Sequence, residues 1–140
     1  MEDFVNRVRD FVERFKELLA DVQDTTDEYE TSDVYDNRWL AAISYLSLLC
    51  LIPIIMDKFS SRKSRFALFH ANQGLVLAII GIGRFVLKIL GRLPILGVLF
   101  NIADLVVSFG VLLLSVIGIV NAANGRAKEL PFIGKIKLIK

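Results

Sequence analysis

Three long apolar runs constrain this chain more than any other feature of its sequence. They extend from Trp39 to Met56, from Phe66 to Leu90 and from about Ile95 to Ala122. A helix rises about 1.5 Å per residue, so each run can cross a hydrocarbon core about 30 Å thick, with some tilt or thinning of the bilayer. The sequence therefore predicts an all-α integral membrane bundle with three transmembrane helices and a lipid bilayer as its surroundings.

The charge is distributed unevenly around these runs. The chain is 54% hydrophobic with a mean hydropathy of +0.55, whereas soluble domains are usually about 45–50% apolar. Residues 1–37 hold 12 acidic residues against 4 basic ones, and the rest of the chain holds 3 against 13. Because the basic residues flank the apolar runs and do not line a soluble face, nucleic-acid binding is not predicted.

The distribution of charge and apolar residues divides the chain into four segments. We expect an amphipathic helix over residues 1–22, an acidic linker over 23–37, a membrane domain over 38–123 and a basic tail over 124–140. The linker has no basic residue and too few apolar ones to fold alone. Within the membrane domain, helices are expected at about 39–56, 66–90 and 95–122.

Charge placement then predicts the topology. With three crossings, the loop 57–65 and the tail share one side, which receives nine Lys and Arg. By the positive-inside rule this side is cytoplasmic, so the sequence predicts an external N-terminus and a multi-pass protein of the cytoplasmic (inner) membrane. A fourth crossing within 79–122 is the alternative, and it would put the two basic segments on opposite faces.

The N-terminal helix has the spacing of a partner-binding surface. Its apolar seam recurs at alternating steps of four and three residues, at Phe4, Val8, Phe11, Phe15, Leu18 and Val22. Its polar residues include six acids against four bases, whereas helices that lie on lipid usually have a basic polar face. We expect the seam to bind a second copy or another membrane protein subunit, with lipid binding as the alternative.

Polar residues inside the apolar runs are costly and need partners. The candidate intramembrane polar residues are His70, Gln73, Arg84, Asn101, Asp104 and Ser115. Antiparallel packing of the second and third runs places Arg84 at the depth of Asn101 and Asp104, which predicts an Arg84–Asp104 ion pair. Alternatively, Arg84 reaches back to the surface as Lys88 and Arg92 do. His70 is expected to satisfy hydrogen bonds between helices.

Small residues predict where helices approach one another closely. The patterns are Gly74-x-x-x-Ala78 and Gly118-x-x-x-Ala122, and such small-xxx-small patterns are common at contacts between membrane helices. No catalytic residue, cofactor site or metal site is predicted. One cysteine, Cys50, and one histidine cannot form a Cys/His metal set, and Gly81-x-Gly83 does not follow a strand.

Several ordered motifs resemble those of a known family. They are Ser44-Tyr45-Leu46, Pro53, Arg65-Phe66-x-x-Phe69-His70-Ala71-x-Gln73-Gly74-Leu75, Gly118-Ile119-x-Asn121-Ala122-x-x-Gly125-x-Ala127 and Leu130-Pro131-x-Ile133-Gly134. The region 37–137 resembles a large family of small bacterial and archaeal membrane proteins, related to the small polytopic subunit of the chloroplast inner-envelope protein translocon. The resemblance implies a fold more than an activity. The chloroplast subunit is drawn with four crossings, and the N-terminal helix lies outside the shared region.

The sequence therefore predicts a non-enzymatic accessory or assembly subunit of a larger membrane complex. The alternative is a conduit or translocon-like component, as the resemblance implies. A conduit needs polar groups along one helix face through the full membrane depth. Residues 75–83 and 105–114 are almost free of them, which argues against a pore within one copy.

Overall fold

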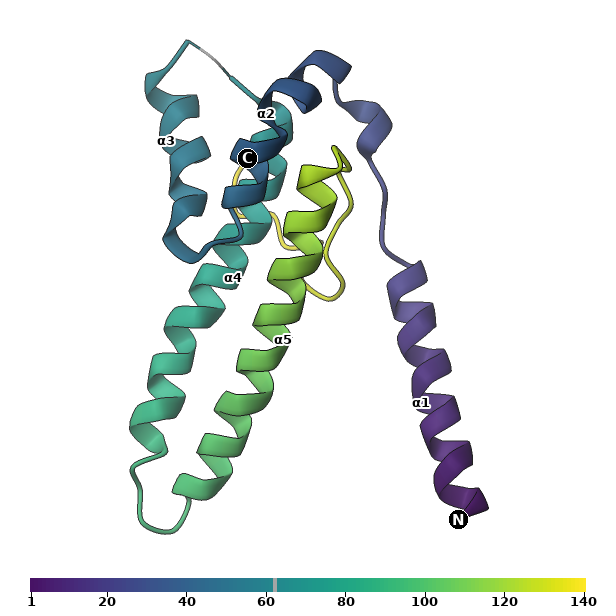
Figure 1. Ribbon diagram of the computed structural model, residues 1–140. Coiled ribbons are helices and arrows are strands. Elements are labelled where there is room, and N and C mark those ends of the chain that lie inside the picture. Colours follow the sequence, from purple (N-terminus) through teal and green to yellow (C-terminus); the bar gives the residue numbers. More distant parts are fainter. Residues whose placement is uncertain (62) are drawn as a thin grey trace.

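The computed structural model describes residues 1–61 and 63–140, apart from the side chains of Leu18 and Leu19. Within these residues the chain is all-helical, without a β-strand. Its elements are α1 (Glu2–Ala20), η1 (Thr26–Glu28), α2 (Thr31–Ile43), η2 (Ser47–Cys50), α3 (Leu51–Phe59), α4 (Arg65–Leu90) and α5 (Gly97–Ala123). Figure 1 shows α4 and α5 as a long antiparallel hairpin, with α2 and α3 at one end of it.

Among the described residues, two helices, α4 and α5, are long and apolar enough to cross a membrane. Their 26 and 27 residues span about 39–41 Å. Ser64 caps the start of α4, because its hydroxyl accepts a hydrogen bond from the Ala67 amide at 3.0 Å. At the far end, the Asn101 side chain donates to the Gly91 carbonyl at 3.2 Å and ties the α4–α5 turn together.

The first apolar run does not form the single transmembrane helix that its length predicted. It is divided into the end of α2, the short η2 and α3, and Figure 1 shows α2 and α3 running in opposite directions. Ser47 has a φ of 56°, which breaks the helix between them. Pro53 lies in the first turn of α3, where its missing amide leaves no helical bond unmade. At about 20 and 14 Å, neither helix spans a bilayer.

The acidic linker is also more ordered than its composition predicted. Its second half begins α2 at Thr31, and Tyr29 and Val34 pack against the core. The linker folds because it finds partners elsewhere in the chain. The Thr25 amide donates to the Ala127 carbonyl at 3.0 Å, and the Glu129 amide donates to the Gln23 carbonyl at 3.0 Å.

These bonds contradict the predicted topology, in which the linker and the tail lie on opposite sides of a membrane. Because α4 and α5 form a hairpin, the segment before α4 and the segment after α5 lie at the same end of it. The backbones of Asp24 and Lys128 pair there in an isolated antiparallel bridge. The third crossing on which the predicted topology depends is absent, because the α2–α3 turn folds the first apolar run back. Arg62, one of the nine basic residues of that prediction, lies outside the described residues.

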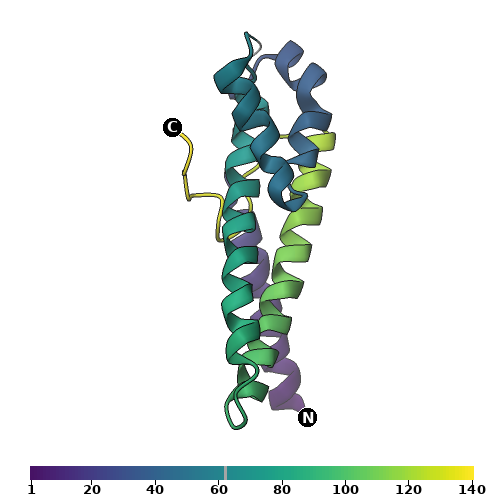
Figure 2. The same cartoon turned by 90° about the vertical axis from the view of Figure 1, so that its left-hand side faces the viewer.

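Most of the core lies at this end of the hairpin. Its buried apolar residues come from α2, the following turn, the first half of α4, the end of α5 and the tail: Ala41, Ala42, Tyr45, Phe66, Val76, Leu77, Ala122, Ala127, Leu130 and Ile133. Figure 2 shows the tail passing from the end of α5 to the outer side of α4. Farther along, α4 and α5 have largely exposed apolar faces. Figure 1 shows α1 apart from the bundle.

Candidate functional site

The start of α4 and the C-terminal tail meet in what we call the polar junction: Tyr45, His70, Asn72, Gln73 and tail residues 128–139. Gln73 is almost fully buried, and its Oε1 accepts a hydrogen bond from the Leu130 amide at 2.7 Å. Its Nε2 donates to the Lys128 carbonyl at 3.5 Å. The Gln73 side chain thus gives two backbone groups of the tail their hydrogen-bond partners. The same two bonds satisfy its own buried amide.

Asn72 holds the tail at a second point, closer to its C-terminal end. Its Nδ2 donates to the Ile136 carbonyl at 2.7 Å. Its Oδ1 accepts from the amides of Leu138 at 2.6 Å and Ile139 at 2.9 Å. Asn72 and Gln73 therefore hold the extended tail against α4 at two separate points.

His70 lies on α4 just before these two residues, and aromatic rings surround its side chain. It is fully buried, and its Nδ1 shares a 2.7 Å hydrogen bond with the Tyr45 hydroxyl. The rings of Phe66, Phe69 and Tyr45 meet the imidazole edge to face, with centroids 4.8, 5.1 and 5.7 Å away. Among the described groups, Nε2 has no hydrogen-bond partner. His70 thus bonds to the turn after α2.

The predicted packing glycines allow the α2–η2 turn to approach the hairpin. A Cβ on Gly74 would clash with the Ser44 carbonyl oxygen, and one on Gly118 would clash with the Tyr45 ring. Ala78 and Ala122 are buried beside them. The small residues therefore admit a third segment between α4 and α5, whereas the pattern alone suggested direct helix–helix contact.

Arg84 and Asp104 form the ion pair that the antiparallel register predicts. Arg84 Nε lies 2.8 Å from Asp104 Oδ1 and Nη2 lies 3.3 Å from Oδ2, and the side chains are 22% and 15% exposed. Asn101, at the same depth, bonds to the turn instead. Ser115 lines a hollow of about 490 Å³ that extends from Tyr45 to Arg84.

The seam of α1 is exposed to solvent. Phe4 and Phe11 are 71% and 69% exposed, and Val8 and Phe15 are 44% exposed. Val22 is half-buried beyond the end of the helix, and the side chain of Leu18 lies outside the described residues. Nothing in the described part of the bundle covers this face.

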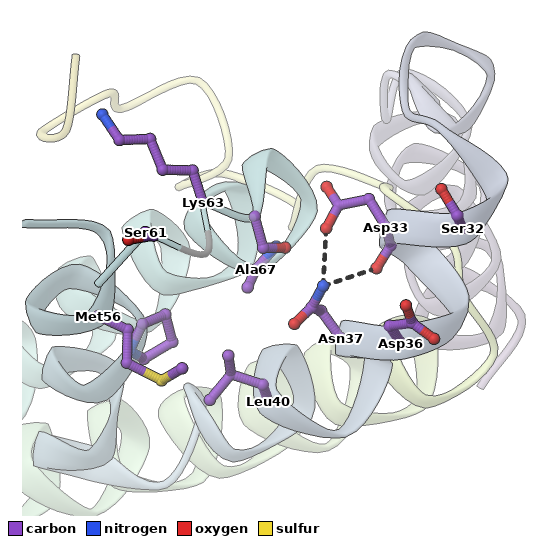
Figure 3. A pocket seen from close by; sticks show the side chains of 11 residues that line it. Ser32, Asp33, Asp36, Asn37, Leu40, Met56, Ser61, Lys63 and Ala67 are labelled. Carbon is purple, nitrogen blue, oxygen red and sulfur yellow. Dashed lines mark hydrogen bonds between the residues drawn. The ribbon is translucent and has the colours of Figure 1, made fainter.

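A larger, more polar hollow of about 730 Å³ lies between α2, α3 and the start of α4 (Figure 3). Asp33 lies on its wall and has several partners. Its Oδ1 accepts from Asn37 Nδ2 at 2.8 Å, and its Oδ2 accepts from the Phe66 amide at 3.1 Å. Across the described residues, no group of three or more His, Cys, Asp or Glu side chains is placed to hold a metal ion.

Sequence reasoning did not select Asn72, Tyr45 or Asp33 as functional candidates. An Asn-Gln pair inside an apolar run was the available signal, because buried amides need partners. Those partners are backbone groups of the tail, which leave no side-chain pattern to recognise. Tyr45 and Asp33 form hydrogen bonds to residues of α4, and the turns that bring them there have no clear signal in the sequence.

These features define a small helical protein with two membrane-length helices, whose buried polar groups gather at one end and bind its own tail. The model of the magnetosome magnetite crystal formation protein family matches residues 36–139, and this chain belongs to that family. The match begins after α1, so the N-terminal helix lies outside it.

Individual relatives agree with this assignment. The magnetosome protein MmsF of Paramagnetospirillum magneticum is 40% identical over 96 residues, which cover 67% of this chain and 78% of the relative. The magnetosome protein MamF of Magnetospirillum gryphiswaldense is 40% identical over 99 residues, with coverages of 69% and 78%. No solved structure matches the chain. The relation to the chloroplast translocon that the motifs implied is not among these findings.

Proposed function

We propose that this chain is a non-enzymatic, multi-pass membrane accessory protein of the magnetosome that acts in magnetite crystal formation. The link to the magnetosome and to magnetite rests on the family and on its relatives. The accessory role rests on the polar junction, whose side chains are engaged in holding the chain's own tail and turn.

The exposed apolar surface of α5 is the observation that carries the membrane placement. Only 6% of its most apolar stretch is buried, so α5 is not the core helix of a soluble domain. Large apolar side chains cover its outside over several turns: Val98, Leu99, Ile102, Leu105, Val106, Phe109, Leu112, Leu113, Val116, Ile117 and Val120. Lipid is the surrounding that suits such a face on a helix of this length.

A conduit within one copy has less support. Apart from Lys88, the exposed large side chains in the outer part of α4 are apolar, and Arg84 and Asp104 neutralise each other. We also propose that α1 docks on protein, either a second copy or another membrane subunit. Its exposed seam and acidic polar face support this choice over an anionic lipid surface.

Gene replacement tests the proposal. In Paramagnetospirillum magneticum, the gene for the MmsF relative is replaced either by the gene for this chain or by an empty cassette. We expect this chain to resist carbonate extraction from purified magnetosomes and to shift the crystal lengths measured by electron microscopy away from those of the empty strain. Carbonate-soluble chain together with crystals like those of the empty strain would contradict the proposal.

A matched pair of variants separates membrane insertion from charge. Phe109→Lys with Leu112→Lys puts two cations on the exposed face of α5, at a cost of about 2.5–3.5 kcal/mol each at the centre of a membrane helix. We expect this variant to lose carbonate resistance and the effect on crystals together. Thr31→Lys with Ser32→Lys adds the same charge outside the apolar runs and should keep both.

A further inference from the structure

A basic hollow of about 330 Å³ lies between the start of α4 and the tail, on the outer side of the polar junction. Three exposed cations line it: Arg65 from α4, and Lys137 and Lys140 from the tail. None of its lining side chains among the described residues is acidic. The hollow therefore concentrates cationic side chains that no acidic side chain within it balances.

The two lysines are held at this place by the fold. Asn72 bonds to the Ile136 carbonyl and to the amides of Leu138 and Ile139, which fixes the backbone on both sides of Lys137. Other tail lysines have acidic partners, since Lys128 lies 3.7 Å from Asp24 and Lys135 lies 3.6 Å from Asp21. Two lysines of the tail thus pair with acidic residues of the N-terminal segment, and two others line the hollow.

The rest of the wall joins the polar side chains of Tyr29, Asn72 and Gln73 to an apolar part. Leu68, Phe69 and Ile139 line the hollow beside the three cations. Arg65 is the first residue of α4, so the hollow lies where a membrane-length helix begins. Cations above an apolar wall at the end of such a helix suit a ligand that has both an anionic and a hydrocarbon part.

We propose that this hollow binds an anionic phospholipid, with the headgroup phosphate among Arg65, Lys137 and Lys140 and an acyl chain along Leu68 and Phe69. The proposal rests on the membrane placement proposed above. Asn72 is a positioning residue in this site, because it holds the lysines without providing charge.

Acidic residues on the opposite side of Arg65 decide which variants test the proposal best. Glu28, Glu30 and Asp33 line a neighbouring hollow that Arg65 and Tyr29 also border. The Arg65 guanidinium lies 5.9 Å from the centre of the Tyr29 ring, so its replacement also removes a packing contact. Lys137 and Lys140 are therefore the better residues to change.

Native mass spectrometry of the full chain in mild detergent tests the site, with phosphatidylglycerol and phosphatidylcholine as probes. We expect phosphatidylglycerol to bind more tightly than phosphatidylcholine. Lys137→Gln with Lys140→Gln should weaken phosphatidylglycerol binding by at least about tenfold, because each cation near a lipid surface makes a sizeable contribution. Lys128→Gln with Lys135→Gln removes the same charge from the same tail and should leave the preference within about twofold of that of the unchanged chain.

Asn72→Ala distinguishes a lipid site that the fold positions from a general attraction of anionic lipid to a basic tail. It keeps every charge, yet it should lose the preference for phosphatidylglycerol while circular dichroism shows the helix content retained. Equal preference in the unchanged chain and the Lys137/Lys140 variant would overturn the proposal, as would displacement of the lipid by equimolar inorganic phosphate. Failure to enter phosphatidylcholine nanodiscs would instead contradict the membrane placement, so the two failures are distinguishable.

Discussion

The backbone of Asp24 pairs with that of Lys128, and their side chains form an ion pair at 3.7 Å. The acidic linker and the basic tail, which the charge pattern assigns to opposite sides of a membrane, therefore lie against each other. The contact joins the segment before α2 to the segment after α5 at one end of the hairpin. Because an even number of crossings returns a chain to its starting side, two spans fit this contact and three do not.

This arrangement predicts that both ends of the membrane domain label from the same side. In a Cys50→Ser background, single cysteines replacing Thr31 and Lys137 should react with a membrane-impermeant maleimide in the same vesicle orientation. Both positions are exposed in the structure. Labelling of the two from opposite sides would restore three crossings and contradict the contact between linker and tail.

The contact between linker and tail should weaken in acid. The side chain and then the backbone amide of Thr26, which both bond to the Asp24 carboxylate, lower its pKa below the ordinary 3.8, and Lys128 and Arg126 add to this. A depressed pKa stabilises the folded state above pH 3.8, and this contribution disappears as pH falls through the lowered value. The Thr25 amide should therefore be less protected from hydrogen exchange at pH values below the lowered pKa of Asp24, once the intrinsic pH dependence of exchange is corrected for.

Asp24→Asn serves as the control for this effect, because it cannot titrate. Its Thr25 protection should no longer change over that pH range. The effect should be small, since Asp24 is exposed and solvent screens its ion pair. Equal pH dependence in both chains would assign the change to another group.

Gly74→Ala should destabilise the bundle by about 1–3 kcal/mol, the usual cost of inserting a methyl group into a filled space. The added Cβ would meet the Ser44 backbone, which cannot move aside as a flexible side chain can. Gly81→Ala is the matched control on the same helix, because its Cβ would meet nothing within 4 Å. That change should be neutral or stabilising by about 0.5–1 kcal/mol. Thermal unfolding in detergent measures both, and equal effects would contradict the close approach.

The Arg84–Asp104 pair should show strong coupling in a double-mutant cycle. Arg84→Leu and Asp104→Leu should each lower the unfolding temperature by several degrees, because each leaves one charge without its partner at membrane depth. The double variant should recover much of that loss, since two leucines suit an apolar surrounding. Additive losses would show that the two side chains do not stabilise each other.

Substitutions in the exposed seam of α1 should abolish its association with protein. Phe11→Asp with Phe15→Asp places two charges on the seam, and chemical crosslinking between copies or to a membrane partner should disappear while membrane insertion is kept. Asn6→Asp with Lys16→Gln changes the net charge equally on the polar face and should preserve the crosslinks. Tight binding of a peptide of residues 1–22 to anionic vesicles, with crosslinks unaffected by either change, would favour lipid instead.

The sequence by itself determined the helical class, the two long apolar helices and the depth at which Arg84 and Asp104 face each other. These follow from local properties, because length, hydropathy and helical register are set within a single run of residues. The amphipathic seam of α1 follows from spacing in the same way. For such features, sequence position and position in space are related by the constant rise of the helix.

Only the tertiary structure decided the course of the first apolar run and the destination of the tail. The run is long enough to span a membrane, but Ser47 turns it back so that Tyr45 can reach His70 and Gly118. The tail is held by Asn72 and Gln73 through its backbone, which is chemically alike at every residue. Neither choice is local, because each depends on contacts between segments far apart in the chain. These contacts return the linker and the tail to one end of the hairpin.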